Sequence, residues 1–181
     1  MKHAATLWVL AVPLLVAGML ASPEVHAQRQ SEFGLELRKS AQSADLDMPV
    51  YPKAMPQRDL GDDSAAVTLG AWGGGFGFRL AVSKLASDDT APQVAAFYRA
   101  ALARHGEVVE CAALASGSPT RSAAAPASRS KPDTPNCDDD RPSKLGSLVL
   151  KVGTKKDFRL VQIEPMPGGS HFQLVRLVAG Q

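Results

Sequence analysis

The chain has 181 residues and a formal net charge of +2, from 20 basic and 18 acidic side chains. This near balance provides no basic surface of the strength that nucleic acid or an anionic membrane requires, so we expect neither as a partner. The length is sufficient for a single domain with a real hydrophobic core.

The N-terminus has the three parts of a secretory signal peptide. Lys2 supplies positive charge, residues 4–20 form an apolar run, and small residues precede an expected cleavage between Ala27 and Gln28. The apolar run is short for a bilayer span, which needs about 20 residues, so cleavage is favoured over a retained anchor. The sequence therefore predicts a periplasmic or secreted protein, with residues 1–27 as the signal peptide and no transmembrane segment in the mature chain.

A single α+β domain is predicted over residues 47–181, after a polar, flexible lead-in over 28–46. Within the lead-in, residues 33–37 alternate and form either an edge strand or part of the flexible segment. Residues 48–56 contain three prolines, which forbid a helix interior and a central strand. This part of the domain is therefore expected to be extended and pinned across the core.

Two strands are predicted over residues 65–69 and 78–84, joined by a glycine-rich hairpin connection over 70–77. In the second strand Phe78, Leu80 and Val82 share one face. The connection is not a phosphate loop, because a strand follows it where that site needs a helix. Trp72 and Phe76 lie in this connection, which makes them candidates for contacting a ligand or partner.

A helix is predicted over residues 91–105. Thr90 and Gln93 form a capping box at its start, and apolar residues then recur at spacings of three and four. Gly106 ends the helix, because it adopts the left-handed conformation that other residues resist. Phe97 and Leu102 are the predicted core residues of this helix.

The second half of the domain is predicted to be mostly strands, at residues 107–111, 145–152, 158–164 and 172–178. The last three form an antiparallel meander. Between them, residues 112–142 lack aromatic residues and periodicity and are predicted to be a disordered insertion. The predicted fold is thus an antiparallel sheet of five to six strands with one main helix packed on one face.

The two cysteines, Cys111 and Cys137, most simply form a disulfide, because an exported chain meets an oxidising compartment. The alternative is a metal site that they share with His105 or His171. No four ligands have metal-like spacing, so this alternative is less favoured. No cofactor is expected.

No nucleophile and histidine base can be paired from the sequence, and we single out no catalytic residue. Lys155, Lys156 and Arg159 form a small basic cluster that could face an anionic ligand. The sequence therefore favours a non-enzymatic binding or assembly module of the cell envelope. It does not identify the partner, and another envelope protein is one candidate. Two alternatives stay open: an envelope hydrolase with an unrecognised site, and a structural subunit that pairs through an edge strand.

Two short motifs resemble those of a class of small exported bacterial α+β domains with no assigned activity. The first is Pro49-x-Tyr51-Pro52-x-Ala54, and the second is Val94-x-x-Phe97-Tyr98-Arg99-x-x-Leu102. In that class a Tyr-Pro-Gly-Ala-like segment precedes a strand and a Phe-Tyr helix. The resemblance covers about residues 47–178 and implies a fold and an envelope location. Lys53 stands where glycine is usual, and the tryptophan that often follows the helix glycine is absent.

Overall fold

The structure is a computed structural model that describes residues 33–113, 120–121, 133–137, 142 and 144–180. These residues belong to one unit of the chain, Ser31–Gln181. The predicted signal peptide, its cleavage between Ala27 and Gln28, and most of the predicted insertion lie outside the described residues. In the part that is described, no helix is long and apolar enough to cross a membrane.

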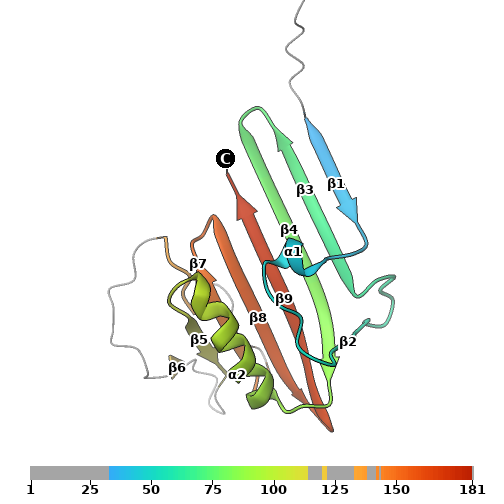
Figure 1. Ribbon diagram of the computed structural model, residues 1–181, viewed down its shortest axis with the longest axis vertical. Coiled ribbons are helices and arrows are strands. Elements are labelled where there is room, and N and C mark those ends of the chain that lie inside the picture. The colour runs from blue at the N-terminus through green and yellow to red at the C-terminus, as the bar shows by residue number, and fades with distance from the viewer. Residues whose placement is uncertain (1–32, 114–119, 122–132, 138–141, 143, 181) are drawn as a thin grey trace, which may run out of the picture. The chain divides into compact units, whose positions relative to one another are not determined.

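A nine-stranded antiparallel sheet forms the framework of this unit (Figure 1). In spatial order the main path contains β1 (Gly34–Arg38), β3 (Ala66–Gly73), β4 (Phe76–Ser87), β9 (Gly169–Ala179), β8 (Asp157–Met166), β7 (Leu148–Gly153), β5 (Val109–Ala112) and β6 (Thr120–Arg121). The two-residue β2 (Met55–Pro56) pairs with β4 outside this path. The predicted antiparallel sheet and C-terminal meander are confirmed, but the predicted count of five to six strands is too low.

One extra strand is β1, which with α1 (Ser43–Leu46) lies in the predicted lead-in over 28–46, so the described part of that segment is ordered structure and the edge strand at 33–37 is present. The other extra strands arise where the sequence has little periodicity. β2 and β6 have two residues each, too few to show alternation, and β6 lies inside the predicted insertion. The predicted hairpin connection over 70–77 is also mostly strand, because only Gly74 and Gly75 separate β3 from β4. Both glycines have positive φ, as a tight two-residue turn requires, so the two strands continue almost to the tip.

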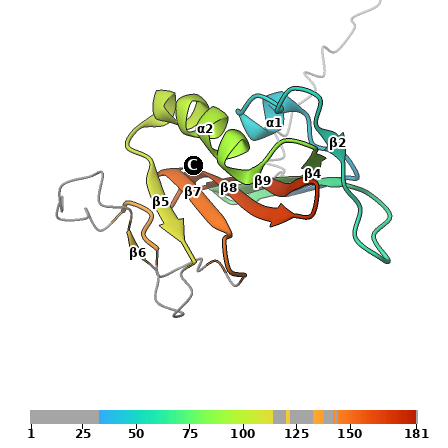
Figure 2. The ribbon, with the colours of Figure 1, turned by 90° about the horizontal axis from the view of Figure 1, so that it is seen from below.

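One helix layer covers one face of the sheet (Figure 2). The predicted main helix is α2 (Ala91–Leu102), which continues into a 3₁₀ turn, η1 (Ala103–His105). The capping box between Thr90 and Gln93 is present. α2 packs on β7, β8 and β9, and the short α1 (Ser43–Leu46) packs on β4 and β9. We call the covered side of the sheet the helix face and the other side the open face.

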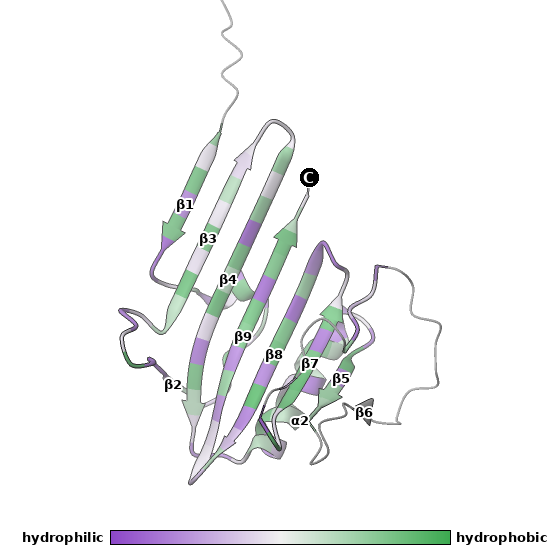
Figure 3. Ribbon diagram, turned by 180° about the vertical axis from the view of Figure 1, so that it is seen from behind, coloured by the Kyte–Doolittle hydropathy of each residue, from purple (hydrophilic) through white to green (hydrophobic). Residues whose placement is uncertain are grey.

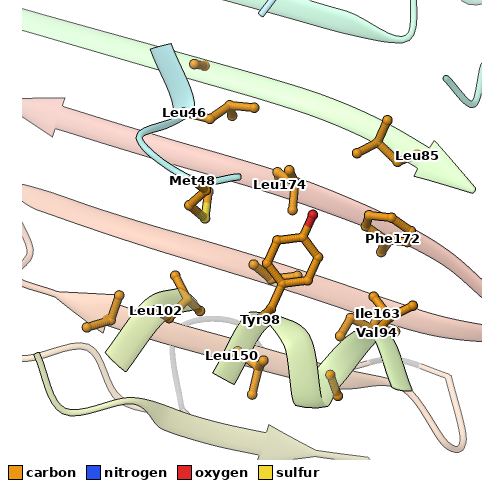
Figure 4. Packing of buried hydrophobic residues seen from close by; sticks show 14 residues of the cluster. Leu46, Met48, Leu85, Val94, Tyr98, Leu102, Leu150, Ile163, Phe172 and Leu174 are labelled. Atoms are coloured by element: carbon orange, nitrogen blue, oxygen red, sulfur yellow. The ribbon is translucent and has the colours of Figure 1, made fainter. Parts of the chain in front are cut away.

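The main core lies between the helix layer and the sheet (Figure 4). Val94, Tyr98 and Leu102 of α2 are fully buried, while Phe97 is partly buried at the core edge. The sheet contributes residues that share the helix face: Leu85, Leu150, Val161, Ile163, Phe172 and Leu174. Fully burying each of these side chains contributes about 1.5–3 kcal/mol, so this face holds most of the hydrophobic stabilisation.

The extended segment over residues 48–56 is pinned to the core by aromatic contacts. The Tyr51 ring lies 5.1 Å from that of Phe97 and 6.0 Å from that of Phe172, both edge-on. Its backbone N–H donates to the Tyr98 hydroxyl (3.1 Å), and its own hydroxyl donates to Asp89 (2.8 Å). The two sequence motifs therefore meet in space, and both have a packing role.

Candidate functional site

The open face, which is toward the viewer in Figure 3, has no described helix packed on it. Strand pairing places rows of apolar residues on this face, and among them only Leu160 is buried. Strand register sets side by side Leu37, Leu69, Leu80, Leu177 and Phe158, one from each of β1, β3, β4, β9 and β8. A row on one side contains Val67, Val82, Val175 and Leu160, and a row on the other contains Leu35, Ala71, Phe78 and Ala179. We call these three rows the apolar band. None of its members is polar or charged.

Exposure is greatest at the β1 end of the apolar band. Leu35 and Leu37 are 73% and 69% exposed, and Phe33 just before them is 72% exposed. Most inner members are half-buried, because neighbouring side chains on the same face shield them, and Leu160 is buried against Cys111 and Val149. Single exposed apolar residues are ordinary on a protein surface, but a contiguous patch of this kind marks an interaction site.

The opposite side of the same strands is charged, on the face toward the helix layer. Arg79 of β4 pairs with Glu36 of β1 at 2.8 Å, and Arg38 pairs with Asp45 of α1 at 2.8 Å. The Arg38 guanidinium, as the largest cause, lowers the pKa of both Glu36 and Asp45. At this end of the sheet the usual arrangement is reversed: charges face the covering layer and apolar side chains face solvent.

A second charged cluster lies further along the helix face. Arg159 of β8 and Arg176 of β9 are directly opposite each other and share two acidic partners, Asp47 and Asp157. The Arg159 guanidinium lowers the pKa of Asp47. The Arg159 side chain is only 7% exposed, so these carboxylates supply the compensation that a buried guanidinium needs.

Along the strands, beyond Val82 of β4, the open face is polar. A shallow cavity of about 220 Å³, the polar pocket, is lined by Lys84, Lys144, Gln162, Glu164, His171 and Gln173 among others. Its cations are already paired: Lys84 with Asp59 (2.5 Å) and Asp62 (2.8 Å), and Lys144 with Glu164 (2.6 Å). Asp59 raises the pKa of Lys84 accordingly. The open face therefore has an apolar centre and one polar border.

The remaining border, over β5 and β7, is covered by residues 133–137. The Cys111–Cys137 disulfide, with a Cα separation of 5.5 Å, ties this segment to β5. Beneath it Cys111, Val149 and Leu160 form a second small core, and the buried Lys151 ammonium donates to the Asn136 carbonyl at 2.9 Å. The predicted disulfide is confirmed, and a metal site at the two cysteines is ruled out because each sulfur is bonded to the other.

The candidate residues in the β3–β4 hairpin lie on different faces. Trp72 covers Gly34 of β1, where a Cβ would lie 2.2 Å from the indole ring. Phe76 is 59% exposed and, like the apolar band, lies on the open face. Phe33 packs against Gly73 beside it, where a Cβ would lie 2.9 Å from the ring. Phe76 and Phe33 thus extend the band toward the hairpin tip, and a ligand role for either stays a prediction.

The predicted basic cluster does not come together as one surface. Lys155 and Lys156 are exposed in the β7–β8 turn, whereas Arg159 points to the helix face and is paired with Asp47. The two histidines are also separated: His171 lies on the open face, and His105 ends the helix layer on the other side. Within the described residues, no group of three or more His, Cys, Asp or Glu could hold a metal ion.

Sequence reasoning missed the apolar band, although its residues alternate visibly in the sequence. Alternation shows that a strand has an apolar face, but it does not show which face the helix layer covers. We interpreted Phe78, Leu80 and Val82 only as one face of a strand. Comparison with protein-family models, with curated proteins and with solved structures finds no match, so the functional argument depends on the geometry of the open face.

Proposed function

We propose that the protein is an exported, non-enzymatic binding or assembly module of the cell envelope, and that the open face is its docking surface. One observation carries the proposal: in β1, and in β4 up to Val82, the large apolar side chains face away from the helix layer, whereas Glu36, Arg38 and Arg79 face toward it. Burying that band against a partner would remove its apolar surface from water, the dominant favourable term in protein association. The polar pocket would then form part of a polar rim.

The envelope location is supported by two independent features. The pattern over residues 1–27 is that of an export signal, and the disulfide requires an oxidising compartment to form and persist. Fractionation of cells that express the full chain tests this location. The protein should appear in the periplasm or medium with its N-terminus at Gln28.

Site-specific photo-crosslinking in living cells tests the docking surface. A photoreactive amino acid at Leu80 or Leu37 should give a defined crosslinked product, because both side chains would lie inside the interface. The same amino acid at Ala96, an exposed position on α2, is the matched control and should give none. The absence of a product at both band positions, or equal products at all three, would refute the proposal.

The two alternatives have less support from the geometry. A hydrolase would need a base beside a nucleophile, and we identify no such pair for His105 or His171. Pairing through an edge strand is favoured by β1, whose Leu35 and Leu37 are strongly exposed at the border of the sheet. Such pairing would cover only that border, however, and would leave the inner rows of the band exposed.

A further inference from the structure

We infer that the open face binds the open face of a second copy of this chain, so that two sheets form a symmetric sandwich. The inference rests on the proposed docking role of that face and adds the identity of the partner. Two sheets that pack face to face lie about 10 Å apart, with strand directions within about 30° of each other. A second copy presents such a face with the same apolar centre and polar border.

The size of the face agrees with a stable dimer. The five strands β1, β3, β4, β9 and β8, whose open side includes the apolar band and the polar pocket, contain 46 residues in all. At about 3.3 Å per residue along a strand and about 4.8 Å between strands, the face measures on the order of 700 Å². Stable interfaces bury about 800 Å² on each partner, and those of homodimers are the more apolar ones.

The two borders of the open face differ in how far they protrude, and this difference favours one orientation of the two-fold axis. Residues 133–137 raise the β5–β7 border, whereas nothing in the described chain covers β1 at the opposite border. A two-fold axis across the strands would stack the raised borders of the two copies on each other. An axis parallel to the strands, between β4 and β9, instead sets each raised border over the bare β1 side of its partner.

The same axis also matches chemistry along the strands. Rotation about this axis leaves the position of each residue along the strand direction unchanged. Apolar rows therefore face apolar rows, and each polar pocket faces the polar pocket of the other copy. Leu80 and Leu177 are paired neighbours on β4 and β9 and lie beside the axis. Each therefore contacts its symmetry mate's band at the centre of the interface, where contacts contribute most to affinity.

Sedimentation equilibrium of the purified full chain, with its disulfide intact, tests the inference. The wild type should be dimeric at micromolar concentration. Leu80→Lys and Leu177→Lys should each raise the dissociation constant by about a hundredfold or more, because each sets two like charges near the axis in an apolar interface. Ala96→Lys on α2 is the matched control and should leave the dimer unchanged. Leu37→Lys provides a second test. The Leu37 side chain is already 69% exposed, so its replacement removes little packing within the single chain.

Two results would overturn the dimer. One is a wild-type chain that stays monomeric throughout the micromolar range, and the other is a dimer that survives all three band substitutions. The outcome is separable from that of the docking proposal. A monomeric chain whose Leu80 still crosslinks to a different protein in cells refutes the second copy and leaves the docking surface standing. A monomeric chain with no crosslink at the band refutes both.

Discussion

Removing the Cys111–Cys137 disulfide should lower the free energy of unfolding by about 3.5 kcal/mol. The bond joins residues 26 positions apart, and closing a loop of that length restricts the unfolded chain by about this amount at 25 °C. For a domain of about 150 residues, the loss corresponds to a decrease in Tm of about 10 °C. The main core lies on the other face of the sheet, so the chain should still fold without the bond.

The structure adds a local consequence to this global one. The disulfide holds residues 133–137 over the small core of Cys111, Val149 and Leu160, and it keeps the Lys151 ammonium buried beside the Asn136 carbonyl. Without the bond, local opening of this segment hydrates Lys151 at a smaller cost than global unfolding does. Amide exchange in β5 and β7 should therefore accelerate more than exchange in β4 and β9.

Urea denaturation measures the predicted loss. The Cys111→Ala, Cys137→Ala double variant and the reduced wild type should unfold at the same urea concentration, well below that of the oxidised wild type. A reductant added to the double variant is the control and should change nothing. A difference below about 1 kcal/mol between oxidised and reduced protein would refute the reasoning, since loop closure would then not be what the bond contributes.

Three further predictions concern the helix, the extended segment and the charged cluster. Leu102→Ala should cost about 3 kcal/mol in urea denaturation because it leaves a cavity in the main core, whereas Arg99→Ala, at an exposed ion pair, should cost less than about 1 kcal/mol. Lys53→Gly should stabilise the chain by about 0.5–1 kcal/mol, because φ is 61° at this residue and glycine adopts that conformation without strain; no gain in Tm would contradict this. Asp47→Asn should destabilise the chain by about 1–2 kcal/mol at pH 7, because Arg159 loses a charged partner. The pKa of Asp47 is lowered in the folded state, so this difference should be constant above the ordinary carboxyl pKa and should vanish as the pH falls through the lowered one. A difference that does not change as the pH falls below the ordinary carboxyl pKa, until the protein unfolds, would contradict the assignment.

The local elements were predictable where the sequence contains its own start and stop signals. Thr90 and Gln93 fix the start of α2, and the cysteine pair follows from the expected compartment without any knowledge of the fold. The resemblance is also interpretable in physical terms. The position where glycine is usual in that class, Lys53, has positive φ, and Tyr51 packs on Phe97 of the second motif.

Parts of the chain with weak periodicity were not predictable from the sequence. The predicted disordered insertion over 112–142 shows the difficulty, because Thr120–Arg121 pairs with β5 and the Asp133 carbonyl accepts a hydrogen bond from the Lys155 N–H. Neither interaction has a local signature, since each joins residues eight or more positions apart. A deletion that spares residues 120–121 and 133–137 is therefore the safer way to test tolerance in this region.

The open face does have a signature in the sequence. Within three strands, the large apolar residues shift from even to odd positions. In β4 the large apolar residues are at even positions up to Val82 and at Leu85 thereafter. In β9 they change between Leu174 and Val175, and in β8 between Leu160 and Val161. Strand register pairs Val82 with Val175 and Val175 with Leu160, so all three changes occur at about the same height.

A strand that runs without a bulge cannot rotate its side chains from one face to the other. The pairing of β4 with β9 and of β8 with β9 is continuous over ten residues each, so each change of phase moves the apolar surface to the opposite side of the sheet. The sheet therefore has two apolar surfaces, one on each side and offset along the strands. The helix layer covers the first, which packs between α2 and residues 161–163 of β8 and 172–174 of β9. The second is the apolar band, of which the described segments cover only the part next to Leu160; the double pattern in the sequence is the reason for proposing it as a docking surface.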